Sequence, residues 1–94
     1  MYFMSNKNNT TIYVGVSSNL VKRVYQHKNK TFKGFTSKYN CDKLVYFEEF
    51  ENIEEAIQRE KQVKKENRKR KEDLINKDNL NWEDLSDGWL FSFD

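Results

Sequence analysis

The sequence predicts an α+β domain in which a three-stranded, largely antiparallel sheet is flanked by helices, in the order β-β-α-β-α-α. Some stretches have the alternation or the aromatic and branched content of β-strands, and others repeat apolar residues at helical spacing. With 94 residues, of which 36% are hydrophobic, the chain can build one core and not two. We therefore expect a single domain over residues 1–85, followed by a C-terminal tail over residues 86–94.

The N-terminal part is expected to form a β-hairpin. A turn-forming run, Asn-Lys-Asn-Asn at residues 6–9, separates Met1–Met4 from a second strand that begins at Thr10. One side of that strand carries aliphatic residues, namely Ile12, Val14 and Val16. Tyr13 should point to the other side, where Gly15 lacks a Cβ and leaves room for a ligand or another backbone.

A helix is expected to begin directly after this strand. The cluster Ser-Ser-Asn at residues 17–19 supplies side-chain oxygens for the N-cap. Apolar residues then recur at helical spacing, namely Leu20, Val21 and Val24. Arg23 and His27 are four positions apart, so we expect them on one helix face near the strand.

The segment between residues 29 and 42 mixes cations with aromatic rings. Its cations include Lys30, Lys33 and Lys38, and its rings are Phe32, Phe35 and Tyr39. Cations meet phosphates and rings stack on exposed bases, so this composition suits a nucleic-acid contact loop. Alternatively, the rings tuck beneath the loop as a satellite core, and the sequence leaves both interpretations open.

A third strand is expected over residues 44–50, followed by a helix that Asn52 and Glu55 cap. The apolar stripe of that helix is Ile53, Ala56, Ile57 and Val63. Glu60 falls inside the stripe, and a carboxylate aimed at a core must be paired, protonated or bound to a cation. One interpretation of Glu60 is a functional acid, and the other is an ion pair with Lys64 one turn later.

Charge is segregated along the chain. Residues 1–43 hold eight Lys or Arg against one acid and residues 44–94 hold nine against fourteen, which is +7 beside −5 although the net charge is +2. A basic working surface for a polyanion explains this segregation better than solvation alone does. The basic run at residues 59–71 is by itself more typical of a solvated face. A final short helix and tail should dock through apolar residues, namely Leu74, Ile75, Leu80, Trp82, Leu85 and Trp89.

Cysteine usage and hydropathy exclude several classes of protein. The single Cys41 cannot form an intramolecular disulfide and no apolar run approaches a membrane span, so we expect the cytoplasm and no membrane partner. With one Cys and one His, the usual four-ligand zinc site cannot be built. Any bound metal should be a hard cation held by few protein oxygens.

In combination, TIYVGV at residues 11–16, R-x-x-x-H-K at 23–28, GFTSKYN at 34–40 and Glu60 resemble the GIY-YIG nuclease family. The resemblance extends over residues 1–85 and is to its small stand-alone members, which are similar to the N-terminal part of excinuclease C. Tyr13-Val14-Gly15 takes the place of the second family tripeptide. Tyr2 takes the place of the tyrosine in the first, but that strand is clipped, and because terminal residues fray most easily, how firmly Tyr2 is held is an open question at this point.

The resemblance implies the same fold and a metal-dependent endonuclease that cuts DNA, in repair or recombination. Glu60 would hold one Mg²⁺ or Mn²⁺ ion and Arg23 would clamp the scissile phosphate. Tyr2, Tyr13 and His27 would position or deprotonate the attacking water. The implied catalytic residues are thus Tyr2, Tyr13, Arg23, His27, Glu60 and Asn79. The implied DNA-binding residues are Arg23, Lys28, Lys30, Lys33 and Lys38.

Two other functions stay open at this point. One is a catalytically weak nucleic-acid-binding module of the same fold, which the clipped first strand favours. The other is a protein-interaction domain with the acidic tail as its contact. The intact set Tyr13, Arg23, His27 and Glu60 favours the nuclease. The natural form of the nucleic acid and the oligomeric state lie beyond what the sequence indicates.

Overall fold

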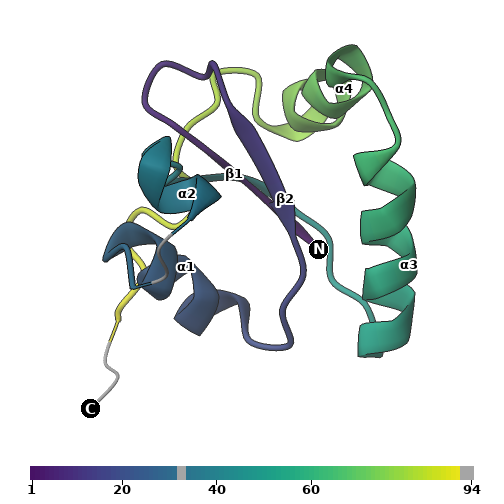
Figure 1. Cartoon of the computed structure of the whole chain (residues 1–94), viewed down its shortest axis with the longest axis horizontal. Helices are drawn as coiled ribbons and strands as arrows, with labels where there is room; N and C mark the ends of the chain where they lie inside the picture. The colour runs from purple at the N-terminus through teal and green to yellow at the C-terminus, as the bar shows by residue number, and fades with distance from the viewer. Residues whose placement is uncertain (32–33, 92–94) are drawn as a thin grey trace.

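A computed structural model describes residues 1–31 and 34–91 (Figure 1). Three strands, β1 (Tyr2–Ser5), β2 (Ile12–Gly15) and β3 (Lys43–Phe47), form one antiparallel sheet in the order β2-β1-β3. The helices are α1 (Leu20–Lys28), α2 (Phe35–Lys38), α3 (Ile53–Lys64) and α4 (Arg68–Asp78). The predicted fold class and element order are confirmed, and the one-turn helix α2 is added within the predicted loop.

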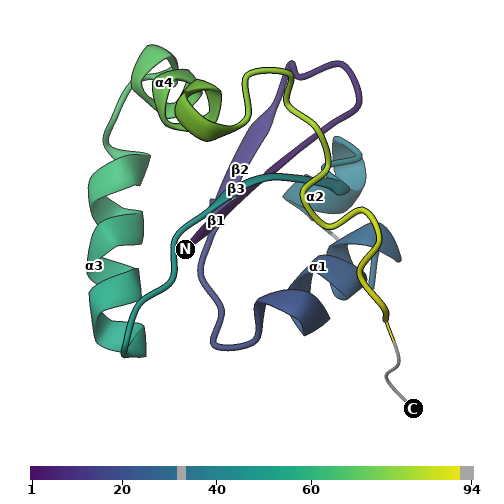
Figure 2. The same ribbon diagram turned by 180° about the vertical axis from the view of Figure 1, so that it is seen from behind.

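The sheet lies between two pairs of helices. Figures 1 and 2 show α1 and α2 beside one face of the sheet and α3 and α4 beside the other. Strand β2 is nearest the viewer in Figure 1, and β3 is nearest in Figure 2. Both are edge strands, so the free edge of β2 lies between the α1 layer and the α3 layer.

Alternation along the strands gives each face its own core, because successive side chains point to opposite sides of a sheet. On the α3 and α4 side, Phe3 and Val14 belong to a buried cluster with Val63 of α3, and this cluster is apolar throughout. On the α1 and α2 side, Tyr2 and Met4 pack with residues that include Val24 of α1, Cys41 and Leu44. The backbone of the sheet separates the two clusters.

Strand β1 occupies the centre of the sheet although it begins at residue 2. It pairs with β2 through Tyr2 opposite Gly15, and with β3 through Tyr2 opposite Phe47. The Met1 carbonyl also accepts a hydrogen bond from Glu48 N at 2.8 Å, which extends the pairing by one residue. Tyr2 is only 2% exposed. Tyr2 is therefore held firmly, because strands pair with β1 on both sides.

Asparagine side chains define the starts of the three longer helices. Oδ1 of Asn19, Asn52 and Asn67 accepts from the backbone N–H three residues later, at 3.1, 2.9 and 3.0 Å. The predicted caps at Asn19 and Asn52 are thus confirmed, and each offsets an orphan donor of its helix. Within residues 1–31 and 34–91, every helix is too short or too polar to span a membrane.

The segment after α4 docks less completely than predicted. Ile75 is fully buried and Trp82 is 8% exposed, as expected for core residues. Leu74 and Trp89 are partly buried, on opposite faces of the sheet. Leu80, in contrast, is 74% exposed. The prediction that Leu80 docks on the core is wrong, because the chain turns directly after α4 and carries that side chain outward.

Candidate active site

A buried, hydrogen-bonded chain of three side chains joins β1, α1 and α2. The Tyr2 hydroxyl lies 2.8 Å from Nε2 of His27, and Nδ1 of His27 lies 3.1 Å from Oγ1 of Thr36. The three residues are 2%, 5% and 8% exposed. Because both ring nitrogens of His27 have partners, the orientation of its imidazole is fixed.

Burial sets the protonation of this chain. Burial, together with the smaller effect of the Arg23 charge, lowers the pKa of His27 to about 4. The imidazole is therefore neutral at pH 7, with one nitrogen donating and the other accepting. Burial also raises the pKa of the Tyr2 hydroxyl above its ordinary value, so Tyr2 keeps its proton at neutral pH. A neutral imidazole thus lies against a protonated phenol.

Two tyrosine rings fill the space above Gly15. A Cβ added there would lie 2.6 Å from the Tyr2 hydroxyl oxygen and 2.8 Å from Cε2 of Tyr13. The centroid of the Tyr13 ring lies 6.2 Å from that of Tyr2 and 5.4 Å from that of His27. Tyr13 points away from the aliphatic side, as predicted. The missing Cβ of Gly15 leaves room, as predicted, but the two tyrosine rings occupy that room instead of a ligand or another backbone.

Arg23 brings a permanent positive charge to this cluster. It lies on α1 one turn before His27 and is partly buried. Its charge lowers the pKa of His27, and it opposes the burial that raises the pKa of Tyr2. The guanidinium is therefore within electrostatic range of both groups. Because Arg stays charged at every relevant pH, this charge does not depend on the state of His27.

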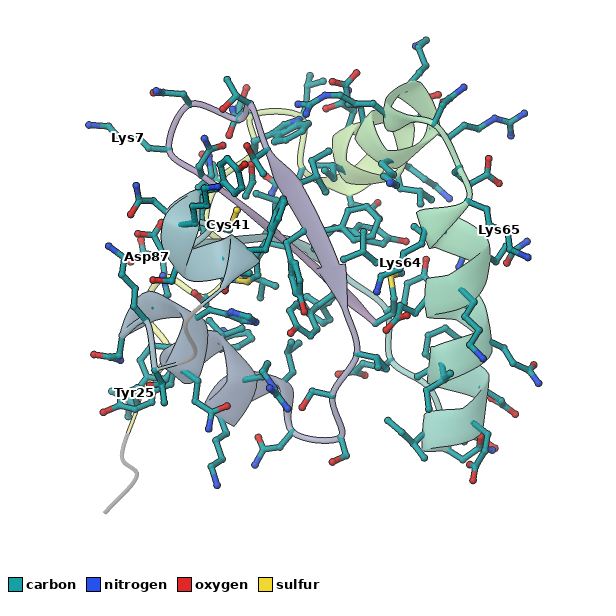
Figure 3. The ribbon with its side chains drawn as sticks, viewed as in Figure 1. Lys7, Tyr25, Cys41, Lys64, Lys65 and Asp87 are labelled. Carbon is teal, nitrogen blue, oxygen red and sulfur yellow. The ribbon has the colours of Figure 1, made fainter. Side chains whose placement is uncertain are left out.

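Glu60 approaches from the opposite layer of the molecule. It lies on α3, its side chain is 16% exposed, and its Oε1 accepts from Nζ of Lys64 at 3.2 Å. Figure 3 shows Lys64 on the side of α3 that faces β2, whereas Lys65 points away from the sheet. The ion pair is the alternative that the sequence left open. Burial is the largest cause of the raised pKa of Tyr2, and the negative charge of Glu60 is a smaller cause that acts in the same direction. Glu60 therefore influences the cluster electrostatically from the other side of the sheet.

Glu60 is the residue that the sequence predicted to hold a metal ion. In the described ranges 1–31 and 34–91, no three His, Cys, Asp or Glu side chains form a group that could bind a metal. A single carboxylate still suits Mg²⁺, which keeps several waters and takes one or two protein carboxylates together with substrate phosphate. The Lys64 side chain is 52% exposed, so it can move into solvent and release the carboxylate. The donor set thus fits a hard cation and does not fit zinc.

The predicted DNA-binding lysines differ in their surroundings. Nζ of Lys28 donates to the Asp42 carbonyl at 2.9 Å and to Asp84 Oδ2 at 2.5 Å, so its ammonium has structural partners. Its contact with nucleic acid stays a prediction. Lys30 is exposed, and Lys38 is exposed with its Nζ 5.4 Å from the centre of the Tyr39 ring. Lys33 lies outside the described residues.

Asn79 lies at the end of α4, where its side chain binds backbone. Its amide donates to the carbonyls of Val45 and Glu83 at 3.0 and 2.8 Å, and its Oδ1 accepts from Glu83 N at 2.9 Å. These three bonds tie β3 to the segment after α4, which is an architectural function. The catalytic role implied for Asn79 stays a prediction.

Thr36 is a residue of the site that the sequence did not reveal. It lies inside the GFTSKYN stretch, but nothing in its spacing from His27 marks it as a partner. The contact arises because α2 folds back on α1, which buries the hydroxyl against Nδ1 of His27. The available signal was weak, namely a small hydroxyl residue among the aromatic residues of this stretch. Phe35 and Tyr39, on either side, are 48% and 42% exposed, so these two rings do not form a satellite core.

A hollow of about 420 Å³ lies beside Tyr2, between the starts of α1 and α3. Its walls include the carboxylates of Glu48, Glu49 and Glu51. Negative walls repel phosphate, so we do not place nucleic acid in this hollow. The cationic groups lie instead on α1 and beside α2, on the side of Tyr13.

Comparison with known proteins shows the family of this chain. A sequence profile of the GIY-YIG catalytic domain matches residues 1–73. A UPF0213 protein of Clostridium perfringens (strain 13 / Type A) is 44% identical over 50 residues, which are 53% of this chain and 54% of that protein. The chain thus spans about half the length of this curated relative. No solved structure matches the chain significantly. Because the profile covers most of the chain, the protein belongs to the GIY-YIG catalytic domain family.

Proposed function

We propose that this protein is a metal-dependent endonuclease that hydrolyses phosphodiester bonds in DNA, in repair or recombination. The observation that carries the proposal is the buried chain of Tyr2, His27 and Thr36 beside Arg23 and the half-buried Tyr13. Burying a neutral histidine and a phenol costs stability unless their hydrogen bonds are satisfied. Here these hydrogen bonds are made, and a buried polar cluster of this kind next to a permanent cation is typical of a catalytic site.

Arg23 is proposed to hold the scissile phosphate. A guanidinium donates through two parallel N–H groups to phosphate oxygens, and it stabilises the charge that grows on them in the transition state. The helix α1 carries it at the side of β2 where Tyr13 reaches the surface. Tyr13 is the tyrosine that can meet an attacking water, because Tyr2 is 2% exposed.

The proton of the water is proposed to reach His27 through two hydroxyls. Tyr13 takes the proton of the water and passes its own proton to Tyr2, and Tyr2 passes its own to Nε2 of His27. His27 is neutral at pH 7 and has one accepting nitrogen, whereas Tyr2 ends the transfer protonated because burial raises its pKa. Thr36 and Tyr2 hold the imidazole in one orientation. In this proposal Tyr2 and Thr36 orient His27, His27 accepts the proton, and Tyr13 and Arg23 contact the substrate.

Glu60 is proposed to hold one Mg²⁺ or Mn²⁺ ion at the β2 edge. When bound, the ion would neutralise negative charge on the reacting phosphate. Lys64, which pairs with Glu60 in the structure, would keep the empty site neutral until the ion arrives.

The cytoplasm is the proposed compartment, since Cys41 is a buried free thiol whose pKa burial raises to about 11.

Cleavage of supercoiled and branched DNA tests the proposal. The protein is incubated with each DNA in Mg²⁺, in Mn²⁺ and in chelator, beside an Arg23→Ala preparation that controls for contaminating nucleases. We expect nicking that needs the metal and that Arg23→Ala lacks. Equal nicking by both preparations would mean that a contaminant cuts the DNA.

A binding module without cleavage is the second candidate, and the Glu60 ion pair favours it. A carboxylate already paired with Lys64 at 3.2 Å has less affinity for a metal than a free one. If the protein binds DNA in a salt-dependent manner yet cuts none of the forms with either metal, this second function replaces the first.

A further inference from the structure

Helix α2 presents two aromatic rings to solvent beside the proposed active site. Phe35 is 48% exposed and Tyr39 is 42% exposed. Their ring centroids are 4.7 Å apart with the planes inclined at 47°. Exposed neighbouring rings of this size are costly unless they contact something. The pair therefore needs an occupant.

The rings continue directly from the active site. The Phe35 centroid lies 6.1 Å from that of Tyr13, whose ring lies in turn 5.4 Å from that of His27. The planes of Phe35 and Tyr13 are tilted by 32°. A row of rings thus leads from the buried histidine through Tyr13 to the surface at Tyr39.

The charge around these rings selects their occupant. Lys38 holds its ammonium 5.4 Å from the centre of the Tyr39 ring, and Lys30 is exposed at the end of α1. No acidic residue lies between residues 1 and 41. A cation beside flat rings suits a group that is itself flat and is carried on a polyanion. A nucleobase on its phosphate backbone meets this description, whereas an apolar peptide would leave the cations unused.

We propose that Phe35 and Tyr39 stack one unpaired nucleobase of the strand whose phosphate lies at Arg23. In an intact duplex both faces of each base are covered by neighbours, so the rings can engage only a base that is unpaired or at an end. The protein therefore prefers bulged, flapped or single-stranded nucleic acid to continuous duplex. This inference rests on the proposed function, because it names the form of the substrate.

Binding in chelator tests the inference separately from cleavage. Three DNAs of equal length are compared by fluorescence anisotropy at one salt concentration: a duplex, the same duplex with a one-base bulge, and the same bulge with an abasic residue. The abasic bulge has the flexible backbone without the base. The proteins are the parent, Phe35→Leu, Phe35→Trp and the control Phe50→Leu. Phe50 is 36% exposed and lies by the acidic hollow, away from α2.

We expect the parent to bind the bulge about tenfold more tightly than the abasic bulge, within the range of one base stacked on an aromatic ring. Phe35→Leu should lose this difference, while Phe35→Trp and Phe50→Leu keep it. Thermal melting checks that each variant folds. If Phe35→Leu does not fold, the binding of Phe35→Trp to the bulge and to the abasic bulge decides whether an aromatic ring at this position is enough. Equal affinity of the parent for bulge and abasic bulge would overturn the inference.

The two proposals fail in different ways. If the base-dependent difference is present and follows Phe35, but no DNA is cut with metal, then the stacking site stands and the nuclease does not. If DNA is cut but the parent binds all three DNAs equally, then the nuclease stands and the stacking site is wrong. A single-stranded RNA arm shows whether the rings also accept bases on a ribose backbone.

Discussion

The two faces of the sheet use the same three strands for opposite purposes. On the α3 and α4 side the strands contribute apolar residues, and Phe3, Val63 and Ile75 are all fully buried. On the α1 and α2 side the same strands bury a phenol against an imidazole and a hydroxyl. Alternation along a strand is enough to separate the two environments, because neighbouring residues face opposite layers.

The difference suggests a division of labour. The apolar face supplies stability, and the other face accepts a cost in stability in order to hold a neutral histidine beside a cation. Glu60 is a polar residue on the apolar side, where it interrupts the stripe of α3 close to the edge strand β2. Substitutions on the two faces should therefore affect stability and cleavage in opposite proportions.

Ile75→Ala should give the largest effect, on stability alone. Ile75 is fully buried in the apolar cluster, and deleting its side chain to Ala leaves a cavity that lowers the free energy of unfolding by about 2–5 kcal/mol. Chemical denaturation measures this loss. The single-turnover cleavage rate per folded molecule should not change, and a rate that falls in step with stability would contradict the separation of the faces.

His27→Gln should change the pH dependence of stability. Folded His27 titrates near a pKa of about 4, below its ordinary value of 6.5, so between these two pH values the unfolded chain binds a proton that the folded one does not. The parent should thus be fully stabilised above pH 6.5 and lose roughly 3 kcal/mol as the pH falls to 4. Gln can make both hydrogen bonds but cannot titrate. Chemical denaturation at several pH values should therefore show that the free energy of unfolding of the variant depends less on pH than that of the parent. If the free energies of both proteins change with pH in parallel, the lowered pKa of His27 is wrong.

Arg23→Lys should slow cleavage while sparing affinity. Lysine keeps the positive charge but loses the planar fork, so the loss falls on the transition state. We expect a single-turnover rate at saturating protein that is roughly a hundredfold lower, with DNA affinity almost unchanged. A variant that cuts as fast as the parent at saturation would remove Arg23 from the proposed mechanism.

Lys30→Ala should have the smallest effect, and unlike Arg23→Lys it should lower the affinity for DNA and not the cleavage rate. Lys30 is exposed at the end of α1, so it is expected to contact phosphate without touching the reacting group. Affinity should fall for all DNA sequences alike, and the slope of log affinity against log salt should drop by about 1. The saturated rate should stay near that of the parent, in contrast to Arg23→Lys.

Local signals in the sequence predicted much of the fold. The caps at Asn19 and Asn52, the hairpin and the outward direction of Tyr13 all depend on residues within a few positions of one another. The central place of β1 depends on a distant contact instead, because β3 pairs with β1 from about forty residues away in the sequence. For that reason the burial of Tyr2 was not predicted.

The site was predicted less completely than the fold. Resemblance named Tyr2, Tyr13 and His27, and the structure brings these three rings together. The contact of Thr36 with His27 depends on how α2 folds back, which no periodicity encodes. The Lys28 ammonium likewise binds Asp84, whose position depends on the docking of the last segment.

Metal-dependent cleavage by Glu60→Gln and Lys64→Gln tests the central claim most directly, namely that α3 adds a metal-binding carboxylate to the polar face across β2. Both substitutions break the same ion pair, whose atoms are 3.2 Å apart, but only the first removes the carboxylate. Cleavage rates are measured during a Mg²⁺ titration for the parent and both variants, with thermal melting to confirm folding. We predict that Glu60→Gln abolishes the metal-stimulated rate, while Lys64→Gln cleaves as fast as the parent at equal or lower Mg²⁺. If the two variants behave alike, Glu60 serves only its ion pair and the claim is wrong.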